Sequence, residues 1–293
     1  MVRISVITPS LNQGRFIERT IESVLTQDAP AFEYIVCDGR SSDTTPDVLA
    51  RYGDRLKLVV ESDRGQADAV NKGIRLTSGE VIGWLNSDDV YAPGALSVVA
   101  AQFDADADLD VLYGQAHLLD ADDRVLGDYY TEPWNPARLV QRCFLCQPAV
   151  FFRRRVIDRF GLLDDGLHYS MDYEYWLRLA AGGATFAYLP TILAGSRLHP
   201  DTKTLGARLA VHQEIDAMLR SRVGRVPESW LINHAHTLVE LRRQRVLPFA
   251  LEVLAEAARL SWQWNGSLSR RLVLDMLRPI AAGARRRVSR VRS

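Results

Sequence analysis

The chain has 293 residues, of which 47% are hydrophobic and 25% charged, as in an ordinary soluble globular protein. Three cysteines are too few for a disulfide framework, and no apolar run approaches the roughly 20 residues that span a membrane. The N-terminal segment lacks the apolar core of a signal peptide, so we expect a cytoplasmic protein.

The formal net charge of zero hides an uneven distribution. From Arg242 onward 12 arginines face three carboxylates, which gives a balance of +9 and leaves −9 for the rest of the chain. A basic tail on an acidic body points to an anionic partner. The tail also contains leucines and no nucleic-acid motif, so we predict peripheral association with an anionic membrane surface. A docked terminal helix with a solvated basic end is the alternative.

The first half of the sequence alternates strand-like and helix-like segments. The predicted strands are ISVITPS, YIVCD, LKLVVES and VIGWL. Helices are predicted between them, and the one after the third strand is expected to close at Gly79. Strands without polar alternation that are separated by helices form a parallel sheet covered on both faces. We therefore predict a doubly wound α/β unit.

The middle of the sequence has a different pattern. Residues 110–120 and 124–132 predict a small β-ribbon joined by a turn. We further predict a strand in QPAVFF, a helix over Arg154–Phe160, an amphipathic helix in MDYEYWLRLAAGG and strand material over 185–200. From Lys203 onward the pattern is mainly helical, with a break at Val246–Pro248.

Polar residues end four consecutive strands of the predicted sheet. They are Thr8, Ser10, Asp38, Ser62, Asp63, Asp88 and Asp89. Each acid alone is typical of a helix cap or a turn. Ligands of open parallel sheets bind at the carboxyl ends of the strands, so together these residues predict a binding site.

The residue types narrow the classes of ligand that this site could bind. The glycine signatures of phosphate loops and dinucleotide folds are missing after the first strand. Cys143 and Cys146 form a single C-x-x-C pair, which favours core packing over zinc. Carboxylates that meet phosphates indicate Mg²⁺ or Mn²⁺, because hard cations take oxygen ligands. Beside such a cation the adjacent Asp88 and Asp89 can both stay ionised.

Five segments closely resemble the family 2 glycosyltransferases, which have the GT-A fold. They are SVITPSLNQGRFIERTIESVLTQ, YIVCDGRSSDTT, DRGQADAVNKGI, GEVIGWLNSDDVYAPGAL and MDYEYWLRLA. The resemblance covers roughly Val2 to Lys203. It implies an inverting transfer of a sugar from a nucleotide diphosphate donor, assisted by a divalent metal. We predict a catalytic domain over 1–205, with a nucleotide-binding half to about 110 and an acceptor half over 111–205, followed by a helical extension over 206–293.

The resemblance assigns roles to the predicted site residues. It implies that Asp38 contacts the edge of the nucleobase and that Thr8 and Ser10 line the nucleoside. Asn-Ser-Asp-Asp, residues 86–89, occupies the position of the family's D-x-D motif without being a literal D-x-D. The implied roles place Asp88 near the ribose, make Asp89 the metal ligand, and put Asp63 and Arg64 against the donor, where Arg64 could offset phosphate charge.

Asp172 matches the acid that family members use as catalytic base, although Met171 stands where Glu is common. A positioned carboxylate can accept the proton of the attacking hydroxyl. Glu174 is the rival base, and on a helix it would point about 200° away from Asp172. Trp176 could stack on an acceptor sugar or pack in the core.

Later residues extend the implied site. In related enzymes a late histidine completes the metal shell or contacts the diphosphate, a role for which His199 is the candidate. Lys203 or Arg197 could supply a further cation to the leaving diphosphate. We expect a UDP-sugar donor because of Asp38, although dTDP presents a similar base edge, and a glycan or lipid-linked acceptor in cell-surface polysaccharide or glycolipid synthesis.

Three other functions compete with sugar transfer. A sugar nucleotidyltransferase would need a glycine-rich basic loop after the first strand, and TPSLNQGRF is poor in both features. A glycoside hydrolase needs separated, opposed carboxyl groups, which adjacent Asp88 and Asp89 do not supply. An inactive nucleotide-sugar-binding module would not need Asp172 in addition to the acids Asp38, Asp88 and Asp89.

Overall fold

The computed structural model describes residues 1–29, 32–200, 202, 206–242 and 248–268. The chain forms two compact units, one of Met1–Leu139 with Cys143–Thr202 and one of Val140–Arg142 with the residues from Lys203 onward. The basic tail beyond residue 268, Lys203, and Val246 and Leu247 of the predicted helix break lie outside the described residues.

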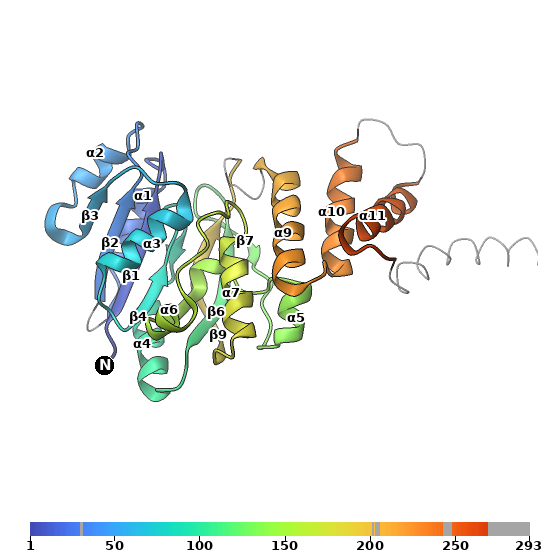
Figure 1. Ribbon diagram of the computed structural model, residues 1–293. Coiled ribbons are helices and arrows are strands. Elements are labelled where there is room, and N and C mark those ends of the chain that lie inside the picture. Colours follow the sequence, from blue (N-terminus) through green and yellow to red (C-terminus); the bar gives the residue numbers. More distant parts are fainter. Residues whose placement is uncertain (30–31, 201, 203–205, 243–247, 269–293) are drawn as a thin grey trace, which may run out of the picture. The chain divides into compact units, whose positions relative to one another are not determined.

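One mixed sheet forms the centre of the larger unit (Figure 1). Its strand order in the described residues is β3-β2-β1-β4-β8-β6-β9-β5, with β7 paired to β6. The strands are β1 (Ile4–Ser10), β2 (Phe32–Asp38), β3 (Lys57–Val60), β4 (Val81–Trp84), β5 (Val90–Tyr91), β6 (Val111–Leu119), β7 (Val125–Asp128), β8 (Val150–Arg153) and β9 (Phe186–Arg197). The first four strands in this order run parallel, which confirms the predicted parallel unit.

Helices cover both faces of the parallel part. They are α1 (Ile17–Leu25), α2 (Thr45–Ala50), α3 (Gln66–Leu76) and α4 (Ala95–Ala105). Apolar side chains of α1, α2 and α4 share one core cluster with Ile4 and Val6 of β1. On the opposite face α3 approaches closely, because a Cβ added at Gly73 would lie 2.4 Å from a methyl carbon of Ile7. The pleat places Ile7 on the other side of β1 from Val6, so the sheet is buried on both faces.

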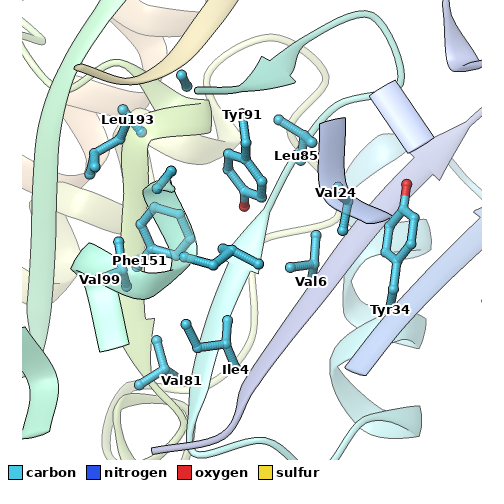
Figure 2. Close-up of a cluster of buried hydrophobic side chains, with 14 of the residues drawn as sticks. Ile4, Val6, Val24, Tyr34, Val81, Leu85, Tyr91, Val99, Phe151 and Leu193 are labelled. Atoms are coloured by element: carbon cyan, nitrogen blue, oxygen red, sulfur yellow. The ribbon is translucent and has the colours of Figure 1, made fainter. Parts of the chain in front are cut away.

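Figure 2 shows how the core joins the parallel strands to the rest of the sheet. Val81 of β4 and Phe151 of β8 lie in one cluster with Val99 of α4 and Leu193 of β9. All of these side chains are buried. Burial of apolar area at about 25 cal/mol per Å² is the main term that stabilises this arrangement.

The second half of the sheet reverses direction. Strand β8 is antiparallel to β4 and to β6, while β9 runs parallel to β6 and antiparallel to β5. Strands β6 and β7 pair antiparallel, with His117 opposite Asp128, which confirms the predicted β-ribbon. The remaining helices of this half are the short α5 (Pro136–Gln141), α6 (Arg155–Phe160) and α7 (Met171–Ala181).

The end of α3 differs from the prediction, because the helix stops at Leu76 and Gly79 is not its cap. Thr77 turns to extended backbone, and its hydroxyl donates to the carbonyl oxygen of Gly73 at 3.0 Å. Gly79 instead lies against β1, where its N–H donates to the Ser5 hydroxyl at 2.8 Å. A Cβ at Gly79 would lie 2.5 Å from that oxygen, so the glycine serves a close approach.

The second unit is helical, with α9 (Arg208–Val223), α10 (Glu228–Glu240) and α11 (Phe249–Asn265). Leu219, Leu231 and Leu260 from the three helices are buried in it. The Asn265 side chain binds both backbone groups of Val226, at 2.8 and 2.9 Å, and so ties the end of α11 to the start of α10. Within the described part of the chain, no helix is long and apolar enough to cross a membrane.

Candidate active site

The carboxyl ends of β1 and β2 place Ser10 beside Asp38. These residues pair in register, and both are buried. The Asp38 carboxylate, 2% exposed, accepts the Ser41 N–H at 2.9 Å and the Ser41 hydroxyl at 2.5 Å. The Ser10 hydroxyl is buried and has no hydrogen-bond partner among the described residues. A buried hydroxyl without a partner costs free energy, so this oxygen is a group that a ligand could satisfy.

Asp63 joins this end of the sheet through the strand next in order. A Cβ added at Gly39 would lie 2.5 Å from Oδ2 of Asp63, so the carboxylate occupies the space directly beside the residue after Asp38. Its other oxygen accepts the Gly65 N–H at 3.0 Å. Thr8 is deeper in β1, where its hydroxyl oxygen accepts the Tyr34 hydroxyl at 3.2 Å. The structure therefore brings Ser10, Asp38 and Asp63 together and places Thr8 behind them.

Arg64 lies at the start of α3 and is largely exposed. Its guanidinium binds the Asp165 carboxylate and lies 3.4 Å from Oδ1 of Asp68. Asp165 belongs to the segment before α7, so Arg64 joins that segment to the start of α3. These ion pairs are solvent-exposed at the arginine, so a phosphate could compete for Arg64 at small cost.

Asp89 is the buried acid of the motif turn between β4 and β5. Its carboxylate, 4% exposed, accepts the Arg197 N–H at 2.9 Å and lies 3.3 Å from Nδ2 of Asn86. Burial, and then the neighbouring charge of Asp88, raise the pKa of Asp89 to about 8. The Thr20 hydroxyl of α1 lies 2.7 Å from the Asp89 carbonyl oxygen. Asp89 is thus engaged inside the turn.

Asp88 is the acid of the turn that reaches the surface. Its side chain is 21% exposed, and Oδ2 lies 3.1 Å from Nε2 of His199. The His199 ring packs against Phe16 with 4.5 Å between ring centroids, and its Nδ1 is buried without a hydrogen-bond partner in the described part of the chain. The structure therefore brings His199 to Asp88, whereas Asp89 points to the backbone of Arg197.

Arg197 lies beneath the same turn. Its guanidinium is fully buried and binds the carbonyl oxygen of Asp88 and the carboxylate of Asp123. Asp123 also accepts from Arg19 at 2.7 Å, so the turn between β6 and β7 is held on two sides. Sequence reasoning considered Arg197 only as a cation for the diphosphate. The structure shows it supporting the motif turn.

Asp172 and Glu174 in the first turn of α7 lie in different surroundings. Asp172 is half-buried, and one oxygen accepts the N–H of Tyr173 at 2.8 Å. Glu174 is 0% exposed and binds Arg178 at 2.9 Å, and Arg178 also donates to the carbonyl oxygen of Leu162. Glu174 is thus part of an internal ion pair. Trp176 is fully buried against Phe152, as the core-packing alternative predicted.

The segment before β8 contacts the motif turn. Burial and the charges of Asp89, Cys143 and Asp172 raise the pKa of the Cys146 thiol well above its ordinary value. Cys143 and Cys146 are free thiols. The next residue, Gln147, bonds Asn86 and was missed in the sequence, where no motif marks it.

The described residues contain no cluster of three or more histidine, cysteine or acidic side chains that could hold a metal alone. Asp88 and His199 nevertheless offer one oxygen and one nitrogen side by side, Oδ2 of Asp88 and Nε2 of His199. Mg²⁺ and Mn²⁺ bind with few protein ligands when substrate phosphates supply the rest. The residues present therefore fit a cation that a diphosphate completes.

The sequence of residues 5–160, more than half of the chain, matches the family model of glycosyl transferase family 2. The chain belongs to that family. It is accordingly a nucleotide-sugar glycosyltransferase, and its mixed sheet with C-terminal helices is the GT-A arrangement.

Named relatives agree with this assignment. The chain is 26% identical over 230 residues to an uncharacterized glycosyltransferase of Rickettsia typhi, covering 73% of this chain and 70% of the relative. The solved structure of S. aureus TarS in complex with UDP-GlcNAc superposes with a TM-score of 0.61 at 18% identity, over 97% of this chain and 87% of that one. The mannosyltransferase PcManGT from Pyrobaculum calidifontis, in complex with GDP-Man and Mn²⁺, has a TM-score of 0.61 at 20% identity, over 97% and 79%. At these identities the two structures share the fold.

Proposed function

We propose that this glycosyltransferase moves a sugar from a UDP-sugar to a hydroxyl of a glycan or lipid-linked acceptor, with inversion. The observation that carries the proposal is the grouping of Ser10, Asp38 and Asp63 at one end of the sheet. A carboxylate at Asp38 can accept the imide N–H of uracil, and the unpartnered Ser10 hydroxyl can bond the nucleoside. TarS was solved with UDP-GlcNAc and PcManGT with GDP-Man, so the shared fold accommodates both bases.

Asp88 and His199 are the residues that would hold a divalent cation. When bound, Mn²⁺ or Mg²⁺ would offset the charge of the diphosphate, and PcManGT was solved with Mn²⁺. The sequence prediction names Asp89 as the metal ligand, and that stays a prediction. The geometry favours Asp88 for direct contact, because the Asp89 carboxylate already accepts the side-chain N–H of Asn86 and the backbone N–H of Arg197.

Asp172 is the proposed catalytic base. The acceptor oxygen attacks C1 of the donor sugar, Asp172 takes the hydroxyl proton, and the bond from C1 to the diphosphate oxygen breaks on the opposite face. This single displacement inverts the anomeric centre. Glu174 is unsuited to the role, because its carboxylate is buried against Arg178. Arg64, whose side chain is largely exposed, would offset charge on the leaving group.

The acceptor and the cellular setting are the broadest part of the proposal. We place the enzyme at the inner face of a membrane in cell-surface polysaccharide or glycolipid synthesis, on the strength of the basic, leucine-containing tail sequence. Sedimentation with vesicles of anionic and of neutral phospholipid tests this placement, because electrostatic binding requires the anionic lipid and weakens with salt.

The first test of the catalytic proposal is nucleoside diphosphate release from UDP-, dTDP- and GDP-sugars with Mn²⁺, Mg²⁺ or chelator. We expect slow hydrolysis of one donor that needs metal and falls sharply in Asp88→Asn. A larger loss of donor hydrolysis in Asp89→Asn than in Asp88→Asn, with intact folding, would favour Asp89 as the metal ligand. No release, together with no nucleotide binding by calorimetry, would favour an inactive module instead.

A further inference from the structure

Asn86, the first residue of the motif, is the centre of a hydrogen-bond network. Its Oδ1 accepts from Nε2 of Gln66 at 2.6 Å and from the indole N–H of Trp84 at 2.9 Å. Its Nδ2 donates to Oε1 of Gln147 at 2.8 Å and lies 3.3 Å from Oδ2 of Asp89. Gln147 closes the network by donating to the Trp84 carbonyl oxygen at 2.6 Å.

Two groups of Trp84 determine the direction of these bonds. The indole N–H can only donate, so the Asn86 atom that faces it is the oxygen. The Trp84 carbonyl can only accept, so the Gln147 atom that faces it is the nitrogen. The Asn86 nitrogen is therefore left for Gln147 and Asp89, and neither amide can be turned over without opposing like groups.

The network has a consequence for the buried carboxylate of Asp89. Nδ2 of Asn86 and the backbone N–H of Arg197 are the two donors at that carboxylate among the bonds of the described residues. A carboxylate at position 86 would remove the first donor and place an oxygen 2.8 Å from Oε1 of Gln147. Because the Trp84 carbonyl holds Gln147 in place, rotating the Gln147 amide would not relieve this contact.

We propose that Asn86 is a positioning residue whose amide nitrogen orients Asp89 and thereby the neighbouring Asp88, so that the site requires an amide rather than an acid at position 86. The role rests on the proposed donor and metal chemistry of the site. It also joins the donor side, through Gln66 of α3, to the segment at Gln147 that leads to β8. Three segments distant in the sequence thus meet at one side chain.

An acid at position 86 would have opposite effects on metal binding in two arrangements. If position 86 faced the cation directly, an acid there would add a ligand and strengthen metal binding. In the observed network, an acid would disturb the turn and weaken metal binding. The substitution Asn86→Asp preserves size and shape, so the sign of its effect on metal binding separates the two cases.

The test measures UDP affinity by calorimetry across a series of Mn²⁺ concentrations, together with kcat and KM for donor hydrolysis. We expect Asn86→Asp to raise the Mn²⁺ concentration for half-maximal UDP binding on the order of 10-fold, to leave metal-free UDP binding unchanged, and to lower kcat more than it raises KM.

Asn71→Asp is the matched control. Asn71 is also a buried amide, bonded at both ends to the backbone of Leu163, and it has no bond to the motif. It should lose thermal stability without a change in the Mn²⁺ requirement.

The outcomes are distinguishable. Tighter Mn²⁺ binding in Asn86→Asp, or no change, would overturn the positioning role. The proposed function would still stand if the wild-type protein bound UDP with metal. Failure of wild-type protein to bind UDP or another donor nucleotide with metal would overturn the proposed function and this role with it. If Asn71→Asp changed the Mn²⁺ requirement as much as Asn86→Asp, the effect would be general destabilisation and the role would fall.

Discussion

Nε2 of His199 lies 3.1 Å from Oδ2 of Asp88, although 111 residues separate the two in the sequence. The contact forms because β9 ends beside the motif turn, where the Arg197 N–H binds Asp89 and the His199 ring packs on Phe16. An imidazole and a carboxylate at this separation can share a cation or a proton. The buried Nδ1 of His199 has no hydrogen-bond partner among the residues that the structure describes.

We expect His199→Ala to raise the Mn²⁺ concentration for half-maximal donor hydrolysis by about 10- to 100-fold, because one of the two proposed protein ligands is lost. The measurement is hydrolysis of the preferred donor across a metal titration. His117→Ala is the control, since His117 lies on the β-ribbon and pairs with Asp128. An unchanged metal requirement in His199→Ala would remove this residue from the cation site.

The two acids of α7 should respond differently to neutralisation. Asp172→Asn should lower the rate of transfer by about 10²- to 10⁴-fold, because a general base contributes that much, while UDP affinity stays the same. Glu174→Gln should act on stability, because it leaves the Arg178 guanidinium in an internal site without its carboxylate. Single-turnover transfer and thermal unfolding of both variants give the answer. Full transfer by Asp172→Asn would contradict the base assignment.

The parallel half of the sheet was predictable because each of its strands and helices has a sequence pattern within one short segment. Four apolar segments separated by helices predict parallel strands, because short helical connections place successive strands in one sheet. The strand ends then lie at the same edge of the sheet, where Ser10 pairs in register with Asp38. The acids at the strand ends could therefore be named from sequence. The ribbon of β6 and β7 was equally accessible, because a turn joins the two strands directly.

The rest of the site depends on contacts that no local pattern records. The reversal at β8 places Gln147 against Trp84, and the return of β9 places Arg197 under Asp88. Both residues act through hydrogen bonds between segments more than 60 residues apart. For the same reason the different surroundings of Asp88 and Asp89 are invisible in the sequence, where they are adjacent and alike.

Arg197 should contribute strongly to stability. Arg197→Met would leave the partly buried Asp88 carbonyl without its Arg197 donor and remove one of the two cations at Asp123, so we expect a loss of about 2–4 kcal/mol in unfolding free energy. Arg19→Met is a matched control at the same carboxylate. Arg19 is partly exposed, and its loss should cost about 1 kcal/mol or less. Urea unfolding of both variants measures the difference, and equal losses would show that burial of Arg197 adds nothing.

Asp110 provides a test of acid stability in the same unit. Burial alone would raise the pKa of this carboxyl, but hydrogen bonds from Arg155 and the Thr185 N–H and the charges of Arg155 and Arg159 outweigh it and hold the pKa below its ordinary value. The unfolded chain therefore binds a proton at higher pH than the folded protein does.

The stabilisation by Asp110 is consequently full above the ordinary pKa of 3.8 and is lost as the pH falls through the lower folded value. We expect Asp110→Asn to lower the unfolding free energy by about 2 kcal/mol at neutral pH, because both arginines are partly exposed and the pair is screened. Urea unfolding from neutral pH down to about pH 3 should show this difference shrinking only below about pH 4. Asp158→Asn, at an exposed position on α6, should show little effect at any pH. A wild-type advantage over Asp110→Asn that stayed constant to the lowest pH would mean that the contribution of Asp110 does not come from its ionised form.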